Sequence, residues 1–320
     1  MKLFFSCDWG TSQFRLRLIN AETLAELGAA KTGYGIAAFY NSWQQQNQPA
    51  AQRQAFYHSY ILEQVKKLKA TFAGSCEEAT IIISGMASSS IGMVELPYKQ
   101  LPFAVDGSNL VVHTIGSGEN NLHPMLVISG ARSETDAVRG EETILAGCDI
   151  ATADNEQLLI LPGTHCKHIV VESGQVTNIA TYITGELFGL LANKSILSNS
   201  IKQNDDPAGN YQNFFEQGVI KGASLNLLNS VFQVRTNQLF GKATPEENYY
   251  FLSGLLIGYE LKDIAKSNAS AITLVCSDGL KAAYLQALSL IQHSKEIHFK
   301  DADEALIKGH SKILHKQVQA

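Results

Sequence analysis

Two short polar segments interrupt apolar runs in a way that suits contact with phosphate groups. The first is DWGTS at 8–12 and the second is PGTH at 162–165, and an apolar-rich stretch stands before and after each. Glycine lets the backbone approach a ligand closely, and backbone amides and hydroxyl groups donate hydrogen bonds to phosphate oxygens. The residues suited to this task are Asp8, Gly10, Thr11, Ser12, Gly163, Thr164 and His165.

The two segments also resemble each other. Both combine an apolar run, a Gly-Thr pair, a polar residue, a basic residue and a second apolar run, which indicates an internal duplication or a coincidence of two similar hairpins. Two such hairpins on either side of a cleft would clamp a nucleoside triphosphate, and Asp8 would hold Mg²⁺, usually through water. The alternative is an ordinary turn, because Asp, Gly, Thr and Ser all favour turns. Neither GxxxxGK[ST] nor GxGxxG occurs, which disfavours P-loop and Rossmann sites.

A third loop has a composition that suits a nucleotide base or ribose. Ser277, Asp278 and Gly279 follow the apolar run 271–276 and precede a helical pattern. Small residues at this point allow close packing against a flat ring, although the same composition is typical of any strand-to-helix connection.

Alternating strands and helices are expected to position these loops. Helical spacing of apolar residues predicts a helix over 55–72. The capping box of Thr244 and Glu247, with Pro245 at the first helical position, predicts the start of another. Apolar runs predict strands in the segments 2–6, 14–19, 79–84, 110–115, 124–128, 158–161, 168–172 and 271–276. Further helices are expected within 136–151, 183–197, 278–291 and 301–317. This alternation favours an α/β protein.

Composition narrows the class of protein. A chain of 320 residues with 45% hydrophobic residues predicts two domains with a ligand cleft between them. The net charge of −5, without a basic stripe, excludes a nucleic-acid footprint. No apolar run reaches the roughly 18 residues of a membrane span, and no targeting segment is evident, so a cytoplasmic location without membrane contact is expected. Five scattered cysteines favour neither a disulfide framework nor a structural zinc site.

The motifs resemble those of the actin, Hsp70 and sugar kinase superfamily, with two phosphate hairpins, a connecting helix and an adenosine loop. Within it, the chain is similar to the 2-dehydro-3-deoxygalactonokinase family. The blocks that carry this resemblance are SGMASSSIG at 84–92, VRGEETILAG at 138–147, LPGTHCKHI at 161–169, ITGELFGLL at 183–191 and FLSGLLIG at 251–258. RGEET followed by PGTHCK is the most specific part. The Ser277-Asp278-Gly279 loop departs from the superfamily pattern because it lacks paired glycines.

The resemblance implies two ribonuclease H-like, actin-like ATPase domains with a nucleotide cleft between them. The expected domains are 1–130, with the sugar-acid-binding residues, and 131–320, with the nucleotide-binding residues and a last helix that packs back on the first domain. The implied reaction is ATP-dependent phosphorylation of the 6-hydroxyl of 2-dehydro-3-deoxy-D-galactonate in galactonate catabolism. The alternatives are a kinase of another 2-keto-3-deoxy sugar acid or small sugar, and a non-catalytic ATP-binding regulator. ATP and Mg²⁺ are the implied cofactors, and a homodimer is the commonest assembly for such an enzyme.

The resemblance also implies roles for individual residues. In related sugar kinases the catalytic Asp follows a Gly and opens a helix shortly before the second phosphate loop. Glu141 takes that place here and is the expected general base, with Glu142 and Asp136 in reserve, although acidic residues are also favoured at any helix start. Arg139 would pair with the substrate carboxylate. The other expected sugar-acid contacts, which would otherwise form a tight polar turn, are Ser84, Gly85, Ser88 and Ser89. Adenosine would contact Ser277, Asp278 and Gly279.

Overall fold

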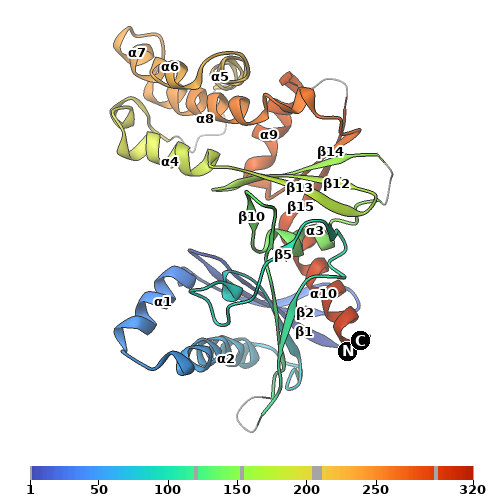
Figure 1. The fold of residues 1–320 in the computed structure, drawn as a ribbon. Helices are drawn as coiled ribbons and strands as arrows, with labels where there is room; N and C mark the ends of the chain where they lie inside the picture. The colour runs from blue at the N-terminus through green and yellow to red at the C-terminus, as the bar shows by residue number, and fades with distance from the viewer. Residues whose placement is uncertain (1, 119–121, 152–154, 204–210, 292–294, 320) are drawn as a thin grey trace. The chain divides into compact units, whose positions relative to one another are not determined.

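A computed structural model describes residues 2–118, 122–151, 155–203, 211–291 and 295–319. The chain forms two compact units (Figure 1). Unit 1 contains Met1–Ala153, Glu172–Ile179 and Ala302–Ala320, and unit 2 contains Asp154–Val171 and Ala180–Asp301. These boundaries differ from the expected domains 1–130 and 131–320, because the strands and helix within residues 131–147 pair and pack within unit 1. The final helix likewise belongs to unit 1.

Unit 1 is built on a six-stranded sheet in the order β3-β2-β1-β4-β8-β7. Its strands are β1 (Leu3–Trp9), β2 (Phe14–Asn20), β3 (Glu26–Thr32), β4 (Thr80–Gly85), β7 (Val112–Ile115) and β8 (Met125–Ile128). The β1-β2 and β2-β3 pairs are antiparallel, whereas β1-β4 and β4-β8 are parallel. Short strands complete the unit: β5 (Lys99–Gln100), β6 (Phe103–Ala104), β9 (Ala131–Arg132) and β10 (Ala137–Val138).

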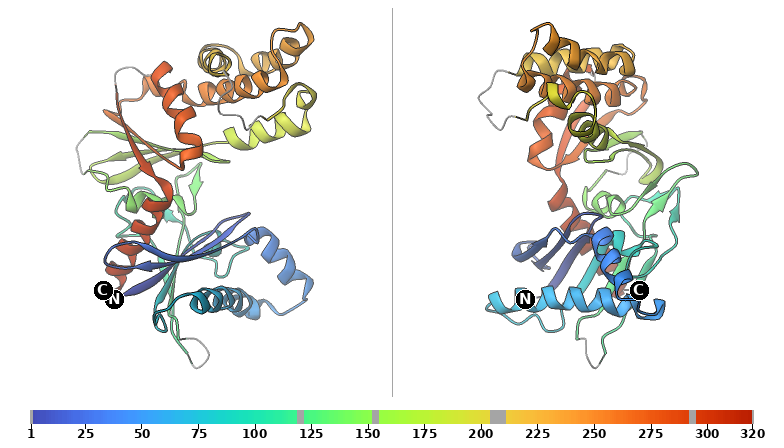
Figure 2. Two further views of the ribbon diagram at one scale, coloured as in Figure 1. Left: turned by 180° about the vertical axis from the view of Figure 1, so that it is seen from behind. Right: turned by 90° about the vertical axis from the view of Figure 1, so that its left-hand side faces the viewer.

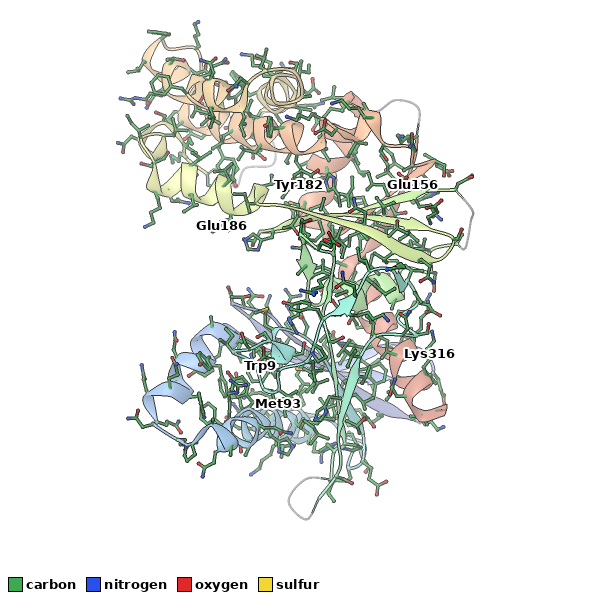
Figure 3. The ribbon with its side chains drawn as sticks, in the orientation of Figure 1. Trp9, Met93, Glu156, Tyr182, Glu186 and Lys316 are labelled. Atoms are coloured by element: carbon green, nitrogen blue, oxygen red, sulfur yellow. The ribbon has the colours of Figure 1, made fainter. Side chains whose placement is uncertain are left out.

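Helices cover both faces of this sheet, which explains why its central strands β2, β1, β4 and β8 are largely buried on both sides. One face packs on α1 (Ile36–Gln45) and α2 (Arg53–Thr71), which lie together on one side of the sheet in the views of Figure 2. Trp9 and Met93 belong to this core (Figure 3). The other face meets α10 (Ala302–Gln319), where Ser6 Oγ lies 2.8 Å from His310 Nδ1, and α10 packs on α3 (Glu141–Gly147).

A second six-stranded sheet repeats this topology. Its strand order is β15-β14-β11-β12-β13-β6, with β11-β12 and β13-β6 antiparallel and both β11-β14 and β14-β15 parallel. The bounds are β11 (Gln157–Leu161), β12 (Cys166–Glu172), β13 (Gln175–Tyr182), β14 (Ala271–Cys276) and β15 (Glu296–Asp301). Strands β13-β12-β11-β14-β15 therefore match β3-β2-β1-β4-β8 one for one. The duplication predicted from the two hairpins is confirmed at the level of topology.

Two helices of unit 2 cross at glycines. They are α5 (Gln212–Ser224) and α8 (Pro245–Leu261). A Cβ atom added at Gly254 would lie 2.1 Å from Phe215 O, and one at Gly218 would lie 2.3 Å from Phe251 O. The capping box predicted at Thr244 is confirmed at the start of α8. The remaining helices are α4 (Thr184–Lys194), α6 (Leu227–Val231), α7 (Gln233–Leu239) and α9 (Asp278–Ile291), with 3-10 turns at Ala50–Gln52, Met86–Ser88, Ser198–Ser200 and Ile264–Lys266.

Candidate active site

The first hairpin is held in place by a buried tryptophan and by the segment that leads into α1. Trp9 is fully buried and contacts the Phe14 ring edge-to-face, with ring centroids 5.0 Å apart. Its indole N–H donates to Tyr34 O at 3.2 Å. Ile36 N donates to Gly10 O at 3.0 Å. The side chains of Thr11 and Ser12 are exposed at the tip. The loop is therefore rigid at its base and presents its hydroxyl groups outward.

Asp8 lies at the carboxyl end of β1, opposite Ser84 of β4 and opposite Arg15 of β2. Burial raises the pKa of the Asp8 carboxyl, while the nearby guanidinium groups of Arg15 and Arg17 lower it. The negative charge of Glu141 also raises the pKa of Asp8. Asp8 and Glu141 therefore interact electrostatically, and both belong to unit 1.

Two glycines allow the backbone segments around these carboxylates to approach each other. Gly85 has φ 85° and ends β4, and a Cβ atom there would lie 2.8 Å from Trp9 O and 3.4 Å from Asp8 Oδ1. Gly140 has φ 112° and precedes α3, and a Cβ atom there would lie 3.4 Å from Gly85 Cα. A side chain at Gly85 would be strained both by this φ and by the contact with Trp9.

The three candidate carboxylates have different surroundings. Glu142 is fully buried and accepts from Gly140 N–H with both oxygens, at 3.0 and 2.8 Å. Burial, and then the charge of Glu141, raise the pKa of Glu142 to about 7. Glu141 is only half-buried and accepts from Arg139 N–H at 2.9 Å. Asp136 accepts from Ala137 N–H at 2.8 Å in the turn between β9 and β10.

The expected sugar-acid residues come together in unit 1. Arg139 Nη1 donates to both the carbonyl and the hydroxyl oxygen of Ser88 at 2.6 Å, and its guanidinium lies 4.1 Å from the Tyr98 ring centroid. Among the described residues, the buried Ser84 Oγ and Arg139 Nε have no hydrogen-bond partner. Ser89 instead donates to Met86 O at 2.7 Å, within the short turn that follows Gly85. Tyr98 was missed because a single tyrosine in a loop carries no recognisable pattern.

The second hairpin is held by the start of α4. Glu186 N donates to Thr164 O at 2.9 Å, and a Cβ atom at Gly185 would lie 2.5 Å from Gly163 O. His165 Nε2 lies 2.6 Å from Glu186 Oε2, and Figure 3 shows Glu186 at the start of α4. Thr164 and His165 are exposed, as Thr11 and Ser12 are. Gly185 and Glu186 belong to the block ITGELFGLL, but the sequence alone indicated no role for them.

The predicted adenosine loop lies at the same edge of the unit 2 sheet as the second hairpin. Strands β11 and β14 are parallel neighbours, so their carboxyl ends, which lead into Gly163 and Ser277, lie side by side. Ser277, Asp278 and Gly279 are exposed. A Cβ atom at Gly279 would meet no atom within 4 Å, so this loop has room for a ligand.

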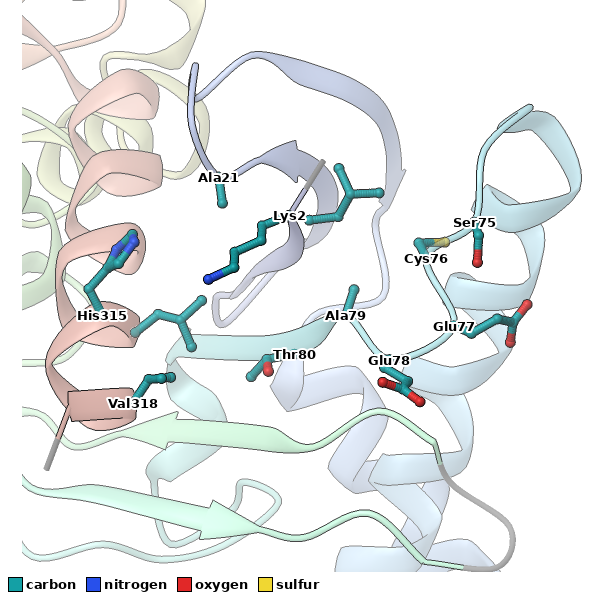
Figure 4. A pocket seen from close by; sticks show the side chains of 12 residues that line it. Lys2, Ala21, Ser75, Cys76, Glu77, Glu78, Ala79, Thr80, His315 and Val318 are labelled. Atoms are coloured by element: carbon teal, nitrogen blue, oxygen red, sulfur yellow. The ribbon is translucent and has the colours of Figure 1, made fainter.

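A cavity of about 730 Å³ in unit 1 lies elsewhere (Figure 4). It is lined by Lys2 and Leu3 at the start of β1, by Ala79 and Thr80 at the start of β4, and by His315 of α10. These are the opposite ends of the strands from Asp8 and Ser84. The cavity therefore contains none of the residues expected in the site.

The protein would supply only part of the ligands of a Mg²⁺ ion at this site. Among the described residues, no group of three or more His, Cys, Asp or Glu side chains is arranged to hold a metal ion. Mg²⁺ usually keeps several waters and takes one or two protein carboxylates plus phosphate oxygens. The half-buried Asp8, with the charge of Glu141 near it, suits that arrangement because a cation would relieve the repulsion between the two carboxylates.

Comparison with known proteins identifies the family of the chain. The sequence matches the family described as 2-keto-3-deoxy-galactonokinase over residues 8–313. It is 32% identical to the 2-dehydro-3-deoxygalactonokinase of Escherichia coli (strain K12) over 216 residues, which cover 66% of this chain and 70% of that protein. A Rhizobium meliloti (strain 1021) protein provisionally given the same enzyme name is 28% identical over 312 residues, 96% of this chain and 94% of its own. A solved Sinorhizobium meliloti structure, also provisionally assigned to this enzyme, is 27% identical, covers 98% of each chain and has a TM-score of 0.76.

The repeated sheet topology and the structural similarity define a protein of the actin-like ATPase and sugar kinase fold. Within that class, the chain belongs to the 2-keto-3-deoxy-galactonokinase family. It is accordingly a kinase, and the fold class and family predicted from the sequence are confirmed. No helix in the described part of the chain is long and apolar enough to cross a membrane.

Proposed function

We propose that this kinase transfers the γ-phosphoryl group of ATP to the 6-hydroxyl of 2-dehydro-3-deoxy-D-galactonate. The relatives named for this activity support the choice of substrate. The observation that carries the proposal is the grouping of Asp8, Glu141 and Arg139 in unit 1, with Gly85 and Gly140 bringing their backbones together. The product would be the 6-phosphate, which serves a later aldol cleavage in galactonate catabolism.

In this proposal Glu141 is the general base. The 6-hydroxyl proton passes to the Glu141 carboxylate while the hydroxyl oxygen bonds to the γ-phosphorus, and the bond to the β,γ-bridging oxygen breaks to release ADP. Glu142 stays in reserve because it is fully buried and both of its carboxylate oxygens accept from Gly140 N–H. Asp136 stays in reserve because it lies in the turn between β9 and β10. Glu141 is the half-buried member of the pair Glu141 and Glu142, so its carboxylate remains accessible to a ligand.

The substrate carboxylate would bind Arg139. Its Nη1 is already used by Ser88, and the Tyr98 ring supports the guanidinium plane, so Nε is left with hydrogen-bonding capacity. The unpartnered Ser84 Oγ would bind a substrate hydroxyl, because a buried polar group without a partner is costly unless a ligand supplies one. Gly85, Ser88 and Ser89 would line the same pocket.

The nucleotide would use both hairpins and the third loop. The phosphate-binding residues would be Gly10, Thr11 and Ser12 in unit 1 and Gly163, Thr164 and His165 in unit 2. Ser277, Asp278 and Gly279 would contact adenosine. Mg²⁺ would be held by Asp8 and would neutralise phosphate charge when bound.

Asp8→Asn is then expected to raise the Mg²⁺ concentration needed for half-maximal activity. An unaltered Mg²⁺ titration would show that Asp8 is only a turn residue.

An ADP-release assay across a panel of 2-keto-3-deoxy sugar acids and small sugars tests the reaction. Release that depends on the galactonate derivative supports the proposal. Release with a different acid or sugar would reassign the substrate, since one pocket hydroxyl can decide such discrimination. Binding of ATP without release on any member of the panel would indicate a regulator of the same fold.

We also infer a cytoplasmic homodimer. All five cysteines are free and buried, as is usual in a reducing compartment, and ATP is the proposed co-substrate. Helices α4 to α7 and the segments around them expose large apolar side chains, among them Leu228 at 86%, Ile196 at 69% and Phe240 at 67% exposure, and such surfaces often mark subunit contacts. Cell fractionation and light scattering of the purified protein test these two inferences, and a monomer by light scattering would overturn the second.

A further inference from the structure

The second hairpin rests on a chain of buried polar groups that the proposed reaction does not itself use. Glu260 of α8 is 3% exposed, and its Oε2 accepts the hydroxyl of Tyr284 of α9 at 2.9 Å. The other oxygen of Glu260, Oε1, lies 3.0 Å from Nε2 of the buried His168 on β12. A buried carboxylate is tolerated only when such partners compensate for its lost hydration.

The series of hydrogen-bonded groups continues from Tyr284 to the backbone of the hairpin. The Tyr284 hydroxyl lies 3.1 Å from Cys166 Sγ. Tyr284 gives its only proton to Glu260, so the Cys166 thiol donates its single proton to the Tyr284 oxygen. Cys166 Sγ accepts from Gly163 N–H at 3.5 Å and lies 3.3 Å from Gly163 O. Burial raises the pKa of Tyr284, and it raises the pKa of Cys166 to about 11, so both groups keep their protons. The connection is therefore a set of hydrogen bonds between neutral donors and one carboxylate.

These contacts connect two predicted parts of the nucleotide site, the adenosine loop and the second hairpin. Tyr284 stands on α9, which begins at the predicted adenosine loop, and Cys166 begins the strand that leaves the hairpin. On its other side the hairpin is held by Gly185 and Glu186 of α4. Within the described residues, a hydrogen-bonded route from α8 to Gly163 passes through Tyr284 and Cys166.

We propose that Glu260 is a positioning residue for ATP, which acts through Tyr284 and Cys166 to hold the backbone at Gly163 in the conformation that presents residues 162–165 to phosphate oxygens. The inference rests on the proposed role of residues 162–165 as a phosphate hairpin. Holding a loop in its binding conformation lowers the ordering cost of ligand binding, so the network contributes to nucleotide affinity. Its residues belong to unit 2, whereas the proposed sugar-acid residues belong to unit 1.

Tyr284→Phe tests this role because it removes the hydroxyl that joins Glu260 to Cys166 and leaves the ring in place. We expect KM for ATP and Kd for ADP to rise about tenfold, the scale of one lost buried hydrogen bond, while KM for the sugar acid stays unchanged. Glu260→Gln retains an acceptor oxygen for Tyr284 and is expected to show a smaller rise than Glu260→Leu.

Asn248→Ala provides the matched control. Asn248 is also buried on α8, but its side-chain amide donates to Ser200 O at 3.1 Å and Val234 O at 2.9 Å, which are not part of the hairpin network. This variant should lose stability without a change in KM for ATP. Equal rises in KM for ATP in Asn248→Ala and Tyr284→Phe would show that general destabilisation is the cause, and would overturn the proposal.

Thr164→Ala separates this inference from the site assignment on which it rests. If Thr164→Ala and Gly163→Ala both leave KM for ATP unchanged, the hairpin does not bind phosphate and both proposals fail. If they raise KM for ATP and Tyr284→Phe does not, the hairpin is correctly assigned and only the role of Glu260 is overturned.

Discussion

Glu141 and Glu142 show how two adjacent residues of one type acquire different properties. Both precede the apolar residues of α3, and both are acidic residues in its first turn. The chain turns at Gly140 in such a way that Glu142 is buried against its own backbone, while Glu141 stays half-exposed. Burial therefore makes Glu142 a group whose charged form is disfavoured, whereas Glu141 keeps access to a ligand.

Glu141→Gln is expected to lower kcat by roughly 10² to 10⁴ fold, the range for loss of a general base, with nearly normal ATP binding. The change preserves size and hydrogen bonding, so the fold should be retained. Steady-state kinetics and calorimetric ATP titration provide the measurements. Glu142→Gln is the control and should keep most of the turnover; the reverse pattern would assign the base to Glu142.

The raised pKa of Glu142 predicts a pH dependence of stability. Its pKa rises from 4.5 to about 7 on folding, so the folded state holds a proton that the unfolded state releases between these values. The free energy of unfolding should therefore fall by up to about 3 kcal/mol as the pH rises from 4.5 through 7. Urea unfolding at pH 5 and pH 8 measures this difference. Glu142→Gln should abolish that part of it, and an identical pH profile in the variant would contradict the assignment.

Helices α5 and α8 illustrate packing at the scale of elements. Gly218 and Gly222 of α5 meet Gly254 and Gly258 of α8, and a Cβ atom at any of the four would lie within 2.3 Å of a backbone atom of the other helix. The close crossing brings Phe215 and Val219 into the core with Leu261 and Tyr284. It therefore supports the part of α8 from which Glu260 reaches the hairpin network.

Gly254→Ala should destabilise unit 2 by about 1–3 kcal/mol or more, because the added methyl group would overlap Phe215 O and force the helices apart. Gly189→Ala is the control. Gly189 is a glycine in α4 where a Cβ atom would meet nothing within 4 Å, so alanine there should leave stability equal or up to about 1 kcal/mol higher. Thermal and urea unfolding compare the two, and equal stability in both variants would refute the close crossing.

At the scale of the whole molecule, the path of the chain is not a simple succession of two domains. After unit 2 the chain returns to unit 1 as α10, which supplies several of its contacts. Asp303 pairs with Arg17 at 2.7 Å and with Arg15 at 3.1 Å, and Gly309 lets α10 pack directly on Thr143 of α3. The last segment of sequence thus supports both the first hairpin and the helix that begins with Glu141.

A chain that ends at Asp301 should therefore fail to fold unit 1, although it retains every proposed catalytic residue. It would lose the buried Leu306, His310 and Ile313 of α10 and the ion pairs of Asp303. Soluble yield, circular dichroism and activity provide the measurements. A chain that ends at Lys316 is the control, because it removes the 78% exposed Val318 and keeps those contacts. Full activity of the shorter chain would contradict this role of α10.

Much of the fold could be predicted because local signals agree with it. Short-range sequence patterns predicted several elements that the structure contains. They are hairpins 8–12 and 162–165, the capping box at Thr244 and the strand before Ser277. Strand β3, with the sequence ELGAAKT, was not predicted because it lies at the edge of its sheet, is half-exposed and contains few strand-favouring residues. Its place is decided by pairing with β2.

The sequence by itself determined the family and the kinase class, and it predicted the loops that would bind phosphate, because such loops require particular residue types at close spacing. Only the tertiary structure decided which carboxylate is buried, that Tyr98 supports Arg139, and that Glu260 reaches Gly163 through Tyr284 and Cys166. Some of these contacts join residues that are far apart in the sequence; Cys166 and Tyr284 are 118 positions apart. No local pattern encodes such contacts, because they arise only when packed helices and sheets bring distant side chains within hydrogen-bonding distance.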